Sequence, residues 1–330
     1  MLSASADSDR PFRTRRSDWP DRKDRLIIGS RGSQLALWQA NYIKNRIAVA
    51  NPALAVDIQV IQTTGDTRPQ VAFSQLGDKG FFTKELEIAL AEGRVDLCVH
   101  SMKDVPTTLP AGMVLGPIPE RAPAQDVLVA RPGVHSLADL ASGARIGTGS
   151  LRRRAQLAAR GGGYTLVDLR GNIDSRVRRV TKGELDAVVI AAAGLERLGW
   201  RELISADIPI EELVPAVGQG ALALEMRRDD ALTAAACAGL ADQPTEICVA
   251  AERRVLIALE GGCQVPLGAH AWIEADQFNL IALVANLDGS WVLTSKISGH
   301  VSASDDITQR VIQELIAQGA PEILQQIRKD

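Results

Sequence analysis

The chain has 330 residues, and this length exceeds that of a domain with a single hydrophobic core, so two or three domains are expected. A hydrophobic content of 46% and a charged content of 23% are typical of a soluble globular protein. No apolar run approaches the roughly 20 residues of a membrane span, which excludes a membrane protein. The net charge of −3 predicts no polyanionic partner for the chain as a whole.

The first 24 residues are rich in Arg, Ser and Asp and lack the apolar stretch of a secretory signal. Acidic residues such as Asp7, Asp9 and Asp18 argue against a transit peptide, because such peptides are poor in acids. We therefore expect a disordered extension over residues 1–24.

Apolar runs rich in β-branched residues alternate with helical patterns through the body of the chain. The runs lie at 25–30, 56–63 and 95–101, with helical patterns at 34–50 and 82–93. This alternation is typical of βαβ units that build a mostly parallel sheet. After Pro123 it resumes, with apolar runs at 126–130, 144–150, 164–170 and 185–194 and helical patterns at 151–160 and 175–183.

The pattern changes at Glu246. A helix at 246–259 precedes a glycine turn, apparent strands at 269–275, 278–287 and 291–299, and a closing helix at 307–319. The expected fold class is therefore α/β, with two α/β domains and a small α+β C-terminal domain. We expect domain 1 over 25–120 and about 221–240, domain 2 over 125–214, and domain 3 over 243–330.

Two strand-to-helix turns are candidate anion sites. In "IIGSRGSQLALWQA", Ser33 is placed to cap a helix that begins near Gln34, with Arg31 beside it. In "ARIGTGSLRRRAQL", Thr148 and Ser150 precede a helix whose first turn carries Arg152 and Arg153. Arginines at that place oppose the helix dipole, and a bound anion would relieve the cost. An ordinary capped turn and a solvated basic face are the alternatives.

Nine arginines lie between residues 145 and 179, against two acids. Within this basic segment, Arg170 ends a strand pattern, and a turn at Gly171 leads to a helix on which Arg176 and Arg179 share a face. Planar guanidinium groups that converge on one site predict a ligand with several carboxylates or phosphates. Nucleic acid is the competing partner, but aromatic residues form only 4% of the chain and none interleaves these arginines.

The segment "VDLCVHSMKDVPTTLP" predicts a parallel strand that ends at His100 and Ser101, followed by a loop with Lys103 and Asp104. Ligands of open α/β sheets bind at the carboxyl ends of the strands. A solvated surface pair is the alternative, but an aspartate among arginines is a group able to transfer protons and oppose positive charge.

The four cysteines form no CxxC pair and only four histidines accompany them, so neither disulfides nor a metal site is expected, and a reducing cytoplasm fits best. Cys263 stands out within "ALEGGCQVPLGAH", because two glycines let the backbone present its sulfur on an exposed turn. A small buried apolar side chain is the alternative.

Eight motifs, in order, resemble those of the porphobilinogen deaminase family, also called hydroxymethylbilane synthases. They are "SRGSQLALWQA", "GDKGFFTKELEIAL", "VHSMKDVPT", "GTGSLRRRAQL", "LRGNIDSRV", "AAAGLERLG", "PAVGQGALALE" and "LEGGCQVPLGA". The resemblance implies two domains like the periplasmic binding protein fold, with the active site between them, and a small third domain. A cysteine of that domain, here Cys263, would carry a dipyrromethane cofactor through a thioether.

The implied activity is that of a transferase in tetrapyrrole, porphyrin and heme biosynthesis. Four porphobilinogen molecules are joined head to tail with loss of ammonia, and the linear tetrapyrrole is released by hydrolysis. The family also implies a cytoplasmic monomer that passes its product to uroporphyrinogen-III synthase and has no nucleic-acid or membrane partner.

Carried over by position, the resemblance makes Asp104 the central acid, which protonates the departing amine and stabilises cationic intermediates. The residues implied for the cofactor are Cys263, Lys103, Ser101, Arg152, Arg153, Thr148, Ser150, Arg170 and Gly171. Those implied for the substrate are Arg31, Ser33, Arg176, Arg197 and Lys79.

Two other functions remain open from the residues alone. A two-lobed small-anion binding or sensor protein would use the same arginines but would need neither Cys263 nor Asp104. An RNA-binding domain would use the basic segment, and the scarcity of aromatic residues argues against it.

Overall fold

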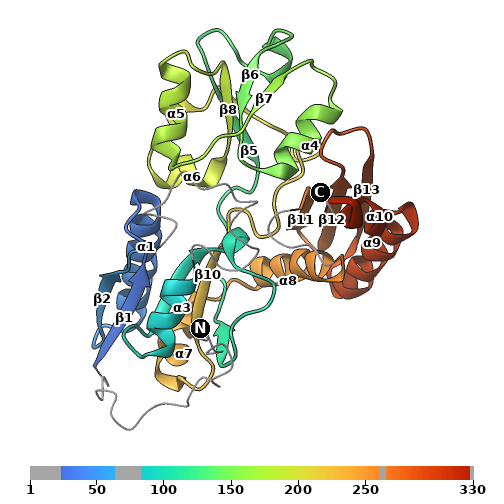
Figure 1. The fold of residues 1–330 in the computed structure, drawn as a ribbon. Coiled ribbons are helices and arrows are strands. Elements are labelled where there is room, and N and C mark those ends of the chain that lie inside the picture. Colours follow the sequence, from blue (N-terminus) through green and yellow to red (C-terminus); the bar gives the residue numbers. More distant parts are fainter. Residues whose placement is uncertain (1–23, 64–82, 260–264, 328–330) are drawn as a thin grey trace, which may run out of the picture.

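A computed structural model describes residues 24–63, 83–259 and 265–327 of the chain. Three separate sheets, each with its own helices, form two lobes and a smaller third unit beside them (Figure 1). Two α/β lobes and a small C-terminal α+β domain were expected, and this fold class is confirmed. Within the described residues, no helix is long and apolar enough to cross a membrane.

The first lobe contains a five-stranded sheet with the order β2-β1-β3-β10-β4. β1, β2 and β3 are parallel, whereas β10 runs antiparallel to both of its neighbours. The strands are β1 (Arg25–Ser30), β2 (Ala55–Val60), β3 (Leu97–Ser101), β4 (Met113–Leu115) and β10 (Leu222–Arg227). The helices are α1 (Gln34–Ala50), α3 (Lys84–Ala91) and α7 (Ala231–Cys237).

The second lobe repeats this plan with the sheet order β7-β6-β8-β5-β9, in which β5 is antiparallel to β8 and β9. Its strands are β5 (Asp126–Ala130), β6 (Arg145–Gly147), β7 (Thr165–Val167), β8 (Ala187–Ala191) and β9 (Ala206–Asp207). Its helices are α4 (Leu151–Ala159), α5 (Ile173–Thr181) and α6 (Ala192–Arg197). The apolar run at 185–194 thus splits into a strand and the start of a helix.

The chain crosses between the lobes twice. The first crossing, residues 116–125, leads from β4 to β5, and the second, residues 215–221, leads back to β10. Each crossing ends at the fourth strand of the sheet that it enters, β5 or β10. Leu222 at the start of β10 pairs with Ser101 of β3, and Ala122 of the first crossing bonds Gly220 of the second, so both crossings lie close to the carboxyl end of β3.

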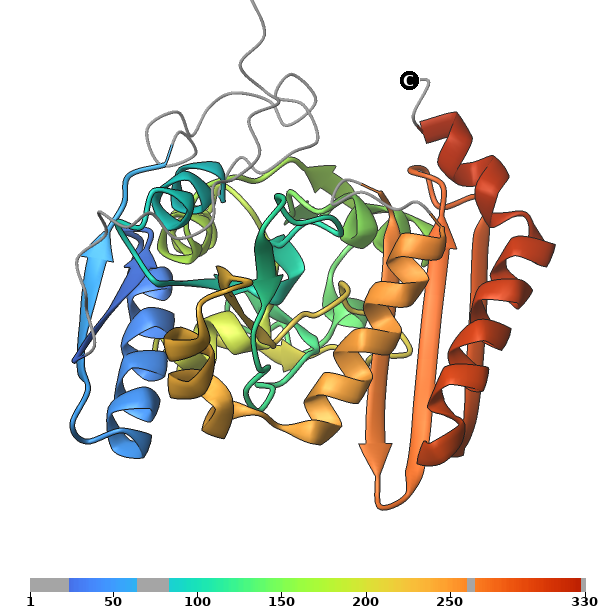
Figure 2. The same cartoon turned by 90° about the horizontal axis from the view of Figure 1, so that it is seen from below.

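The third unit is an antiparallel sheet of β11 (Leu267–Glu274), β12 (Gln277–Ala285) and β13 (Val292–His300). Three helices accompany it: α8 (Gln243–Ala258), which Asp242 caps, α9 (Ser304–Gln318) and α10 (Ala320–Ile327). Figure 2 shows α8 and α9 running alongside the strands.

The middle strand, β12, is apolar on both faces because both faces are covered. Phe278 and Leu280 pack among the helices of the third unit. Ile281 and Leu283 belong to a second cluster with Ala155 of α4, in the second lobe. The third unit is therefore packed directly against the helix that carries Arg152 and Arg153.

Candidate active site

Asp104 lies in a short 3₁₀ turn, Met102–Asp104, directly after β3. Met102 and Val105 are buried, with 1% and 2% of their surface exposed, whereas Asp104 is exposed and Lys103 is half-buried. The two apolar side chains anchor the turn, and the turn presents Lys103 and Asp104 at the carboxyl end of the strand.

The turn after β1 lies beside this loop, because β1 and β3 are parallel neighbours. Ser33 accepts a hydrogen bond from the backbone N–H of Ala36 at 3.3 Å, so the predicted cap of α1 is confirmed. Arg31 is half-buried in the same turn. Ser101 accepts a hydrogen bond from Gln39 at 2.9 Å, which joins the end of β3 to α1.

In the second lobe, the start of α4 is capped in the same way. The Ser150 hydroxyl accepts from the backbone N–H of Arg153 at 3.4 Å. Thr148 is buried, and its hydroxyl accepts from the N–H of Ser150 at 3.2 Å.

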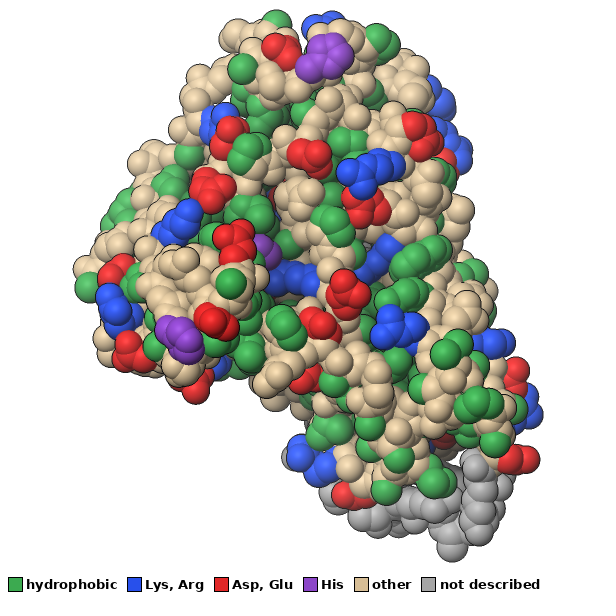
Figure 3. Space-filling model, turned by 180° about the vertical axis from the view of Figure 1, so that it is seen from behind, with side chains coloured by type: hydrophobic (Ala, Val, Ile, Leu, Met, Phe, Trp, Pro, Cys, Tyr) green, Lys and Arg blue, Asp and Glu red, His purple; other side chains and the backbone are tan. Residues whose placement is uncertain are grey.

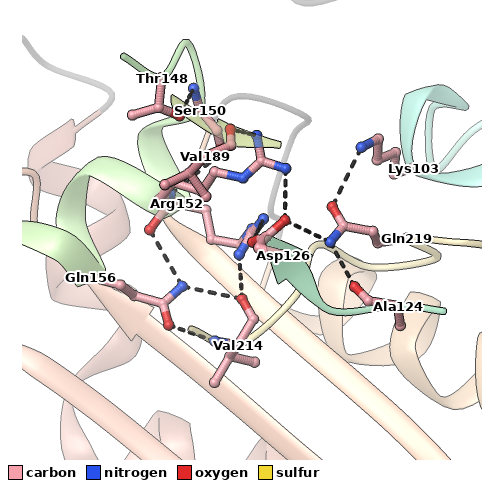
Figure 4. Close-up of polar contacts among 11 residues, drawn as sticks. Lys103, Ala124, Asp126, Thr148, Ser150, Arg152, Gln156, Val189, Val214 and Gln219 are labelled. Carbon is pink, nitrogen blue, oxygen red and sulfur yellow. Dashed lines mark hydrogen bonds and ion pairs between the residues drawn. The ribbon is translucent and has the colours of Figure 1, made fainter. Parts of the chain in front are cut away.

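Arg152 and Arg153 are both buried and converge on the carboxylate of Asp126 (Figure 4). Arg152 donates to Oδ2 at 2.8 Å and Arg153 to Oδ1 at 2.7 Å. Their second amino groups donate to the carbonyls of Val214 and Val189. The anion that the first helical turn requires is thus supplied, at least in part, by the chain itself.

Asp126 was not predicted as a site residue. Burial alone would raise its pKa, but the two arginines outweigh burial and hold the pKa well below the usual range of an aspartate. The signal that could have revealed it is an acid at the start of "DVLVA", an otherwise apolar run whose residues 126 to 129 are all buried.

Gln219, on the second crossing, connects the two lobes at this point and was also missed. Its amide nitrogen donates to Asp126 at 2.8 Å and to the carbonyl of Ala124 at 2.6 Å. Its amide oxygen accepts from Nζ of Lys103 at 3.3 Å (Figure 4). Lys103 is therefore separated from the buried arginine pair only by one amide and one carboxylate.

The pKa of Lys103 is lowered to about 8 by burial and by the positive charge of Arg153, against the opposing charges of Asp104 and Asp126. A cationic ammonium group in this position is held close to other cations. Any additional carboxylate placed nearby would stabilise the charged form of this group.

Arg176 of α5 belongs to the same electrostatic group. Its Nε donates to the carbonyl of Gly171 at 2.8 Å. Burial and the charge of Arg153 lower its pKa to about 10, while Asp104 and Asp168 oppose the shift. Gly171 has φ of +96°, the left-handed region that favours glycine, so the turn before α5 needs this residue.

Arg170 and Arg197 lie differently. Arg170 is half-buried, with Nε 3.4 Å from the carboxylate of Asp168. Arg197 is buried between the lobes, where it donates to the carbonyl of Gly220 at 2.6 Å, and its guanidinium lies 5.7 Å from the ring centre of Trp38 on α1. No described contact joins Arg197 to Lys103 or Arg176.

The basic segment is divided between the site and the outer surface. Arg178 pairs with Asp174 one helical turn away, Arg179 with Glu184, and Arg160 with Glu212. Arg176 and Arg179 therefore have different surroundings. On the face in Figure 3, acidic and basic side chains of the described residues are interspersed, which does not favour nucleic acid there.

Lys79 and Cys263 lie outside the described residues, as do residues 1–23 of the expected extension. The neighbours of the glycine turn, Leu259 and Val265, both pack in the core of the third unit.

The composition of the site suits a ligand that carries several carboxylates. Lys103, Arg152, Arg153 and Arg176 outnumber the carboxylates of Asp104 and Asp126, so the group has an excess of positive charge. The Nε atoms of Arg152 and Arg153 are buried and have no hydrogen-bond partner in the described part of the chain. Among those same residues, no cluster of three or more His, Cys, Asp or Glu side chains could hold a metal ion.

Two family models match the chain. The model described as porphobilinogen deaminase, dipyromethane cofactor binding domain, matches residues 26–235, and that of the porphobilinogen deaminase C-terminal domain matches residues 246–317. The porphobilinogen deaminase of Desulforamulus reducens is 40% identical over 306 residues, which cover 93% of this chain and 99% of that protein. The porphobilinogen deaminase of Moorella thermoacetica is 45% identical over 303 residues, 92% of this chain and 96% of the other.

Among solved structures, one match is the L-cystine solute receptor of Neisseria gonorrhoeae in its unliganded open conformation. It is 16% identical, with a TM-score of 0.37, over 73% of this chain and 91% of the receptor.

Proposed function

Because this chain belongs to the porphobilinogen deaminase family, we propose that Asp104 is the central acid of its reaction. The activity is that of the family, hydroxymethylbilane synthesis, and the chain is a transferase of tetrapyrrole biosynthesis whose small-molecule substrate is porphobilinogen. Four substrate molecules are joined head to tail, each losing ammonia, and the linear product is released by hydrolysis. A non-catalytic anion-binding protein is not favoured.

The exposure of Asp104 is the observation that carries its proposed role. Of the carboxylates near the site's cations, Asp126 is fully buried and hydrogen-bonded to two arginines, and Asp168 pairs with Arg170, whereas Asp104 is exposed beside Lys103. Asp104 can therefore approach the aminomethyl nitrogen of a substrate. It would hold the proton with which that nitrogen leaves as ammonia, and its negative charge would stabilise the positive charge left on carbon.

The cationic side chains bind and orient carboxylates in this proposal. Dipyrromethane, when attached, supplies the ring on which the chain is built, and each pyrrole ring brings two carboxylates. Cys263 would form the thioether to it. The residues proposed to hold its carboxylates and backbone are Lys103, Ser101, Arg152, Arg153, Thr148, Ser150, Arg170 and Gly171. Those proposed for porphobilinogen and the growing product are Arg31, Ser33, Arg176, Arg197 and Lys79.

Domain boundaries follow the three sheets in this proposal: 25–120 with about 221–240, 125–214, and 243–330. These boundaries are supported by β10 and α7, which pack in the first lobe although they follow the second lobe in the sequence. We also propose a cytoplasmic monomer that passes its product to uroporphyrinogen-III synthase. The buried thiols of Cys98, Cys237 and Cys248, which are all free, suit a reducing compartment.

Turnover of Asp104 variants tests the central role. We expect Asp104→Asn and Asp104→Ala to keep the fold and lose nearly all conversion of porphobilinogen. Asp57→Asn, which removes an exposed carboxylate of the same lobe, should keep conversion within about twofold of the unmodified enzyme. Near-normal conversion by either Asp104 variant would remove the residue from the mechanism.

The attachment at Cys263 is tested by intact-protein mass and Ehrlich's reagent. The unmodified protein should exceed its sequence mass by a two-pyrrole adduct and give a colour, and Cys263→Ser should abolish both. Cys248→Ser is the matched control, because burial raises the pKa of its thiol to about 12 and keeps it unreactive. An adduct that persists in Cys263→Ser would contradict the assignment.

A further inference from the structure

One side chain of α8 reaches the loop that follows Asp104. The guanidinium of Arg253 donates from Nη2 to the carbonyl oxygens of Pro106 at 2.9 Å and Thr107 at 3.4 Å. Its Nη1 donates to the carbonyl of Val105 at 3.4 Å and lies 3.9 Å from the sulfur of Met102. Three consecutive carbonyls directly after Asp104 thus share one cation from the third unit.

These carbonyls depend on Arg253. Within the described part of the chain, none of the three accepts another hydrogen bond. The backbone bond that closes the turn, from the N–H of Val105 to the carbonyl of Met102, is 3.1 Å long. A planar guanidinium can address several acceptors at fixed angles, whereas a lysine ammonium in the same place is a compact point charge on a flexible stem.

The helix that carries Arg253 is itself held in place by buried side chains. Val249, one turn earlier, is fully buried in a small cluster with Met102 and Val105. Glu252 is also fully buried and accepts from both amino groups of Arg121 on the first crossing, at 2.6 and 3.1 Å. It accepts from the N–H of Gly218 on the second crossing at 2.7 Å. Residues 249, 252 and 253 share one helical face, which contacts both crossings and the loop of Asp104.

We propose that Arg253 is a positioning residue that fixes the carboxylate of Asp104 by holding the backbone of residues 105 to 107. The proposal rests on the proposed role of Asp104. In the sequence, α8 leads into the glycine turn with Cys263, so the same helix joins the segment that bears the proposed cofactor attachment to the loop that bears the acid. Loss of the guanidinium would leave three carbonyls without their donor and let the loop move. A displacement of about 1 Å at a reacting group can lower the rate by about 100-fold.

The test compares Arg253→Gln and Arg253→Lys with the neighbouring variant Arg254→Gln. Arg254 is on the same helix but is partly exposed and pairs with Asp305 of α9, away from the loop. We expect Arg253→Gln to lower kcat between about 10- and 100-fold with KM within threefold, and Arg253→Lys to recover part of the loss. Hydrogen exchange at the amides of Val105 and Thr107 should accelerate in Arg253→Gln in the absence of substrate. Arg254→Gln should change neither quantity by more than about twofold.

A kcat of Arg253→Gln within twofold of the unmodified holoenzyme, or unchanged exchange in the loop, would overturn the proposal. If Arg253→Gln does not fold, Arg253→Lys decides by the same two criteria. Asp104→Asn is assayed alongside to separate this proposal from the one on which it rests. An inactive Asp104→Asn with a normal Arg253→Gln contradicts only the positioning role, whereas an active Asp104→Asn contradicts the proposed function.

Discussion

The side-chain amide of Gln219 donates to the carboxylate of Asp126 across 2.8 Å, and this contact is made by a residue of the second crossing between the lobes. The same amide accepts from Lys103 of the first lobe, so one uncharged side chain lies between a cation of one lobe and the acid of the other. We expect Gln219→Met, which keeps the length but removes the amide, to lower the free energy of unfolding by about 1–3 kcal/mol.

Urea denaturation of the holoenzyme measures this loss, and kcat/KM should fall with it because Lys103 loses a partner. Gln125→Met is the control, since among the described residues the side chain of Gln125 bonds only Asp207, at 3.4 Å in a solvent-exposed contact. Equal stability of the two variants would mean that Gln219 does not join the lobes energetically.

Asp126→Asn should be more damaging, because it leaves two buried guanidinium groups with a neutral partner. Removing one member of a buried ionic group typically costs about 3–5 kcal/mol. The lowered pKa of Asp126 gives this loss a pH dependence. A carboxylate whose folded pKa is depressed stabilises the fold above its unfolded pKa near 3.8, and the stabilisation disappears as the pH falls through the folded value.

Urea unfolding at pH 7, 5 and 3 checks this prediction. The difference between the unmodified protein and Asp126→Asn should be constant from pH 7 to 5 and smaller at pH 3. Asp57→Asn, at an exposed ion pair, should change stability by less than about 1 kcal/mol at pH 7. A difference that does not shrink in acid would show that the charge of Asp126 is not its source.

The sequence allowed the elements and caps of the fold to be predicted because their causes are local. The predicted cap residue Ser33 accepts from the N–H group three residues ahead, and Ser150 caps α4 in the same way. Gln219 could not be found in this way, and Asp126 gave only the signal of an acid in an apolar run, which does not identify its partners. Their roles depend on residues 26 to 116 positions away in the sequence, which only the crossing topology brings together.

The basic segment also shows a limit of prediction from the sequence. Its arginine count predicted one anion-binding surface, but position on α5 separates Arg178, which pairs with Asp174 at i,i+4, from Arg176, which turns toward Gly171. Counting charge in a window cannot distinguish these two directions. Arg253 was likewise missed, because it is one of two adjacent arginines in an amphipathic helix, a pattern typical of a solvated surface.

Lys103 should give the free enzyme an alkaline limit. Its pKa of about 8 lies well below the ordinary value of 10.5, so it carries its charge below pH 8 and loses it above. The loss of one cation weakens the binding of carboxylates, and kcat/KM, which follows ionisation of the free enzyme, should fall as the pH rises from 7 to 9. The effect of Lys103 on stability has the opposite pH dependence, so stability rises with pH over this range. Burial penalises the protonated lysine below pH 8, and the penalty fades between about 8 and 10.5.

Lys103→Arg separates this group from other titrations, because an arginine keeps its charge throughout that range. Steady-state kinetics should show the fall in kcat/KM for the unmodified enzyme and a flatter profile for Lys103→Arg. The same alkaline fall in both proteins would assign the limit to another group.

Gly289, in the turn between β12 and β13, should not tolerate substitution by a residue with a side chain, because it lies against the backbone of α4. A Cβ at this position would be 2.3 Å from the nitrogen of Ala159 and 2.7 Å from the carbonyl oxygen of Ala155. Its φ of +73° adds the cost that any L-residue pays in the left-handed region, about 1–2 kcal/mol. Gly289→Ala must therefore move either the turn or the helix that carries Arg152 and Arg153.

Gly133→Ala isolates the contact from the backbone strain. Gly133 has a similar φ of +86°, and a Cβ there would meet nothing within 4 Å. Both variants should lose stability in urea unfolding, but Gly289→Ala should lose about 1–3 kcal/mol more, the usual cost of overpacking. Only Gly289→Ala should also lower kcat, because only there does the clash act on α4. Equal losses of stability in the two variants would mean that the turn of the third unit shifts to accommodate the methyl group without disturbing the arginine pair.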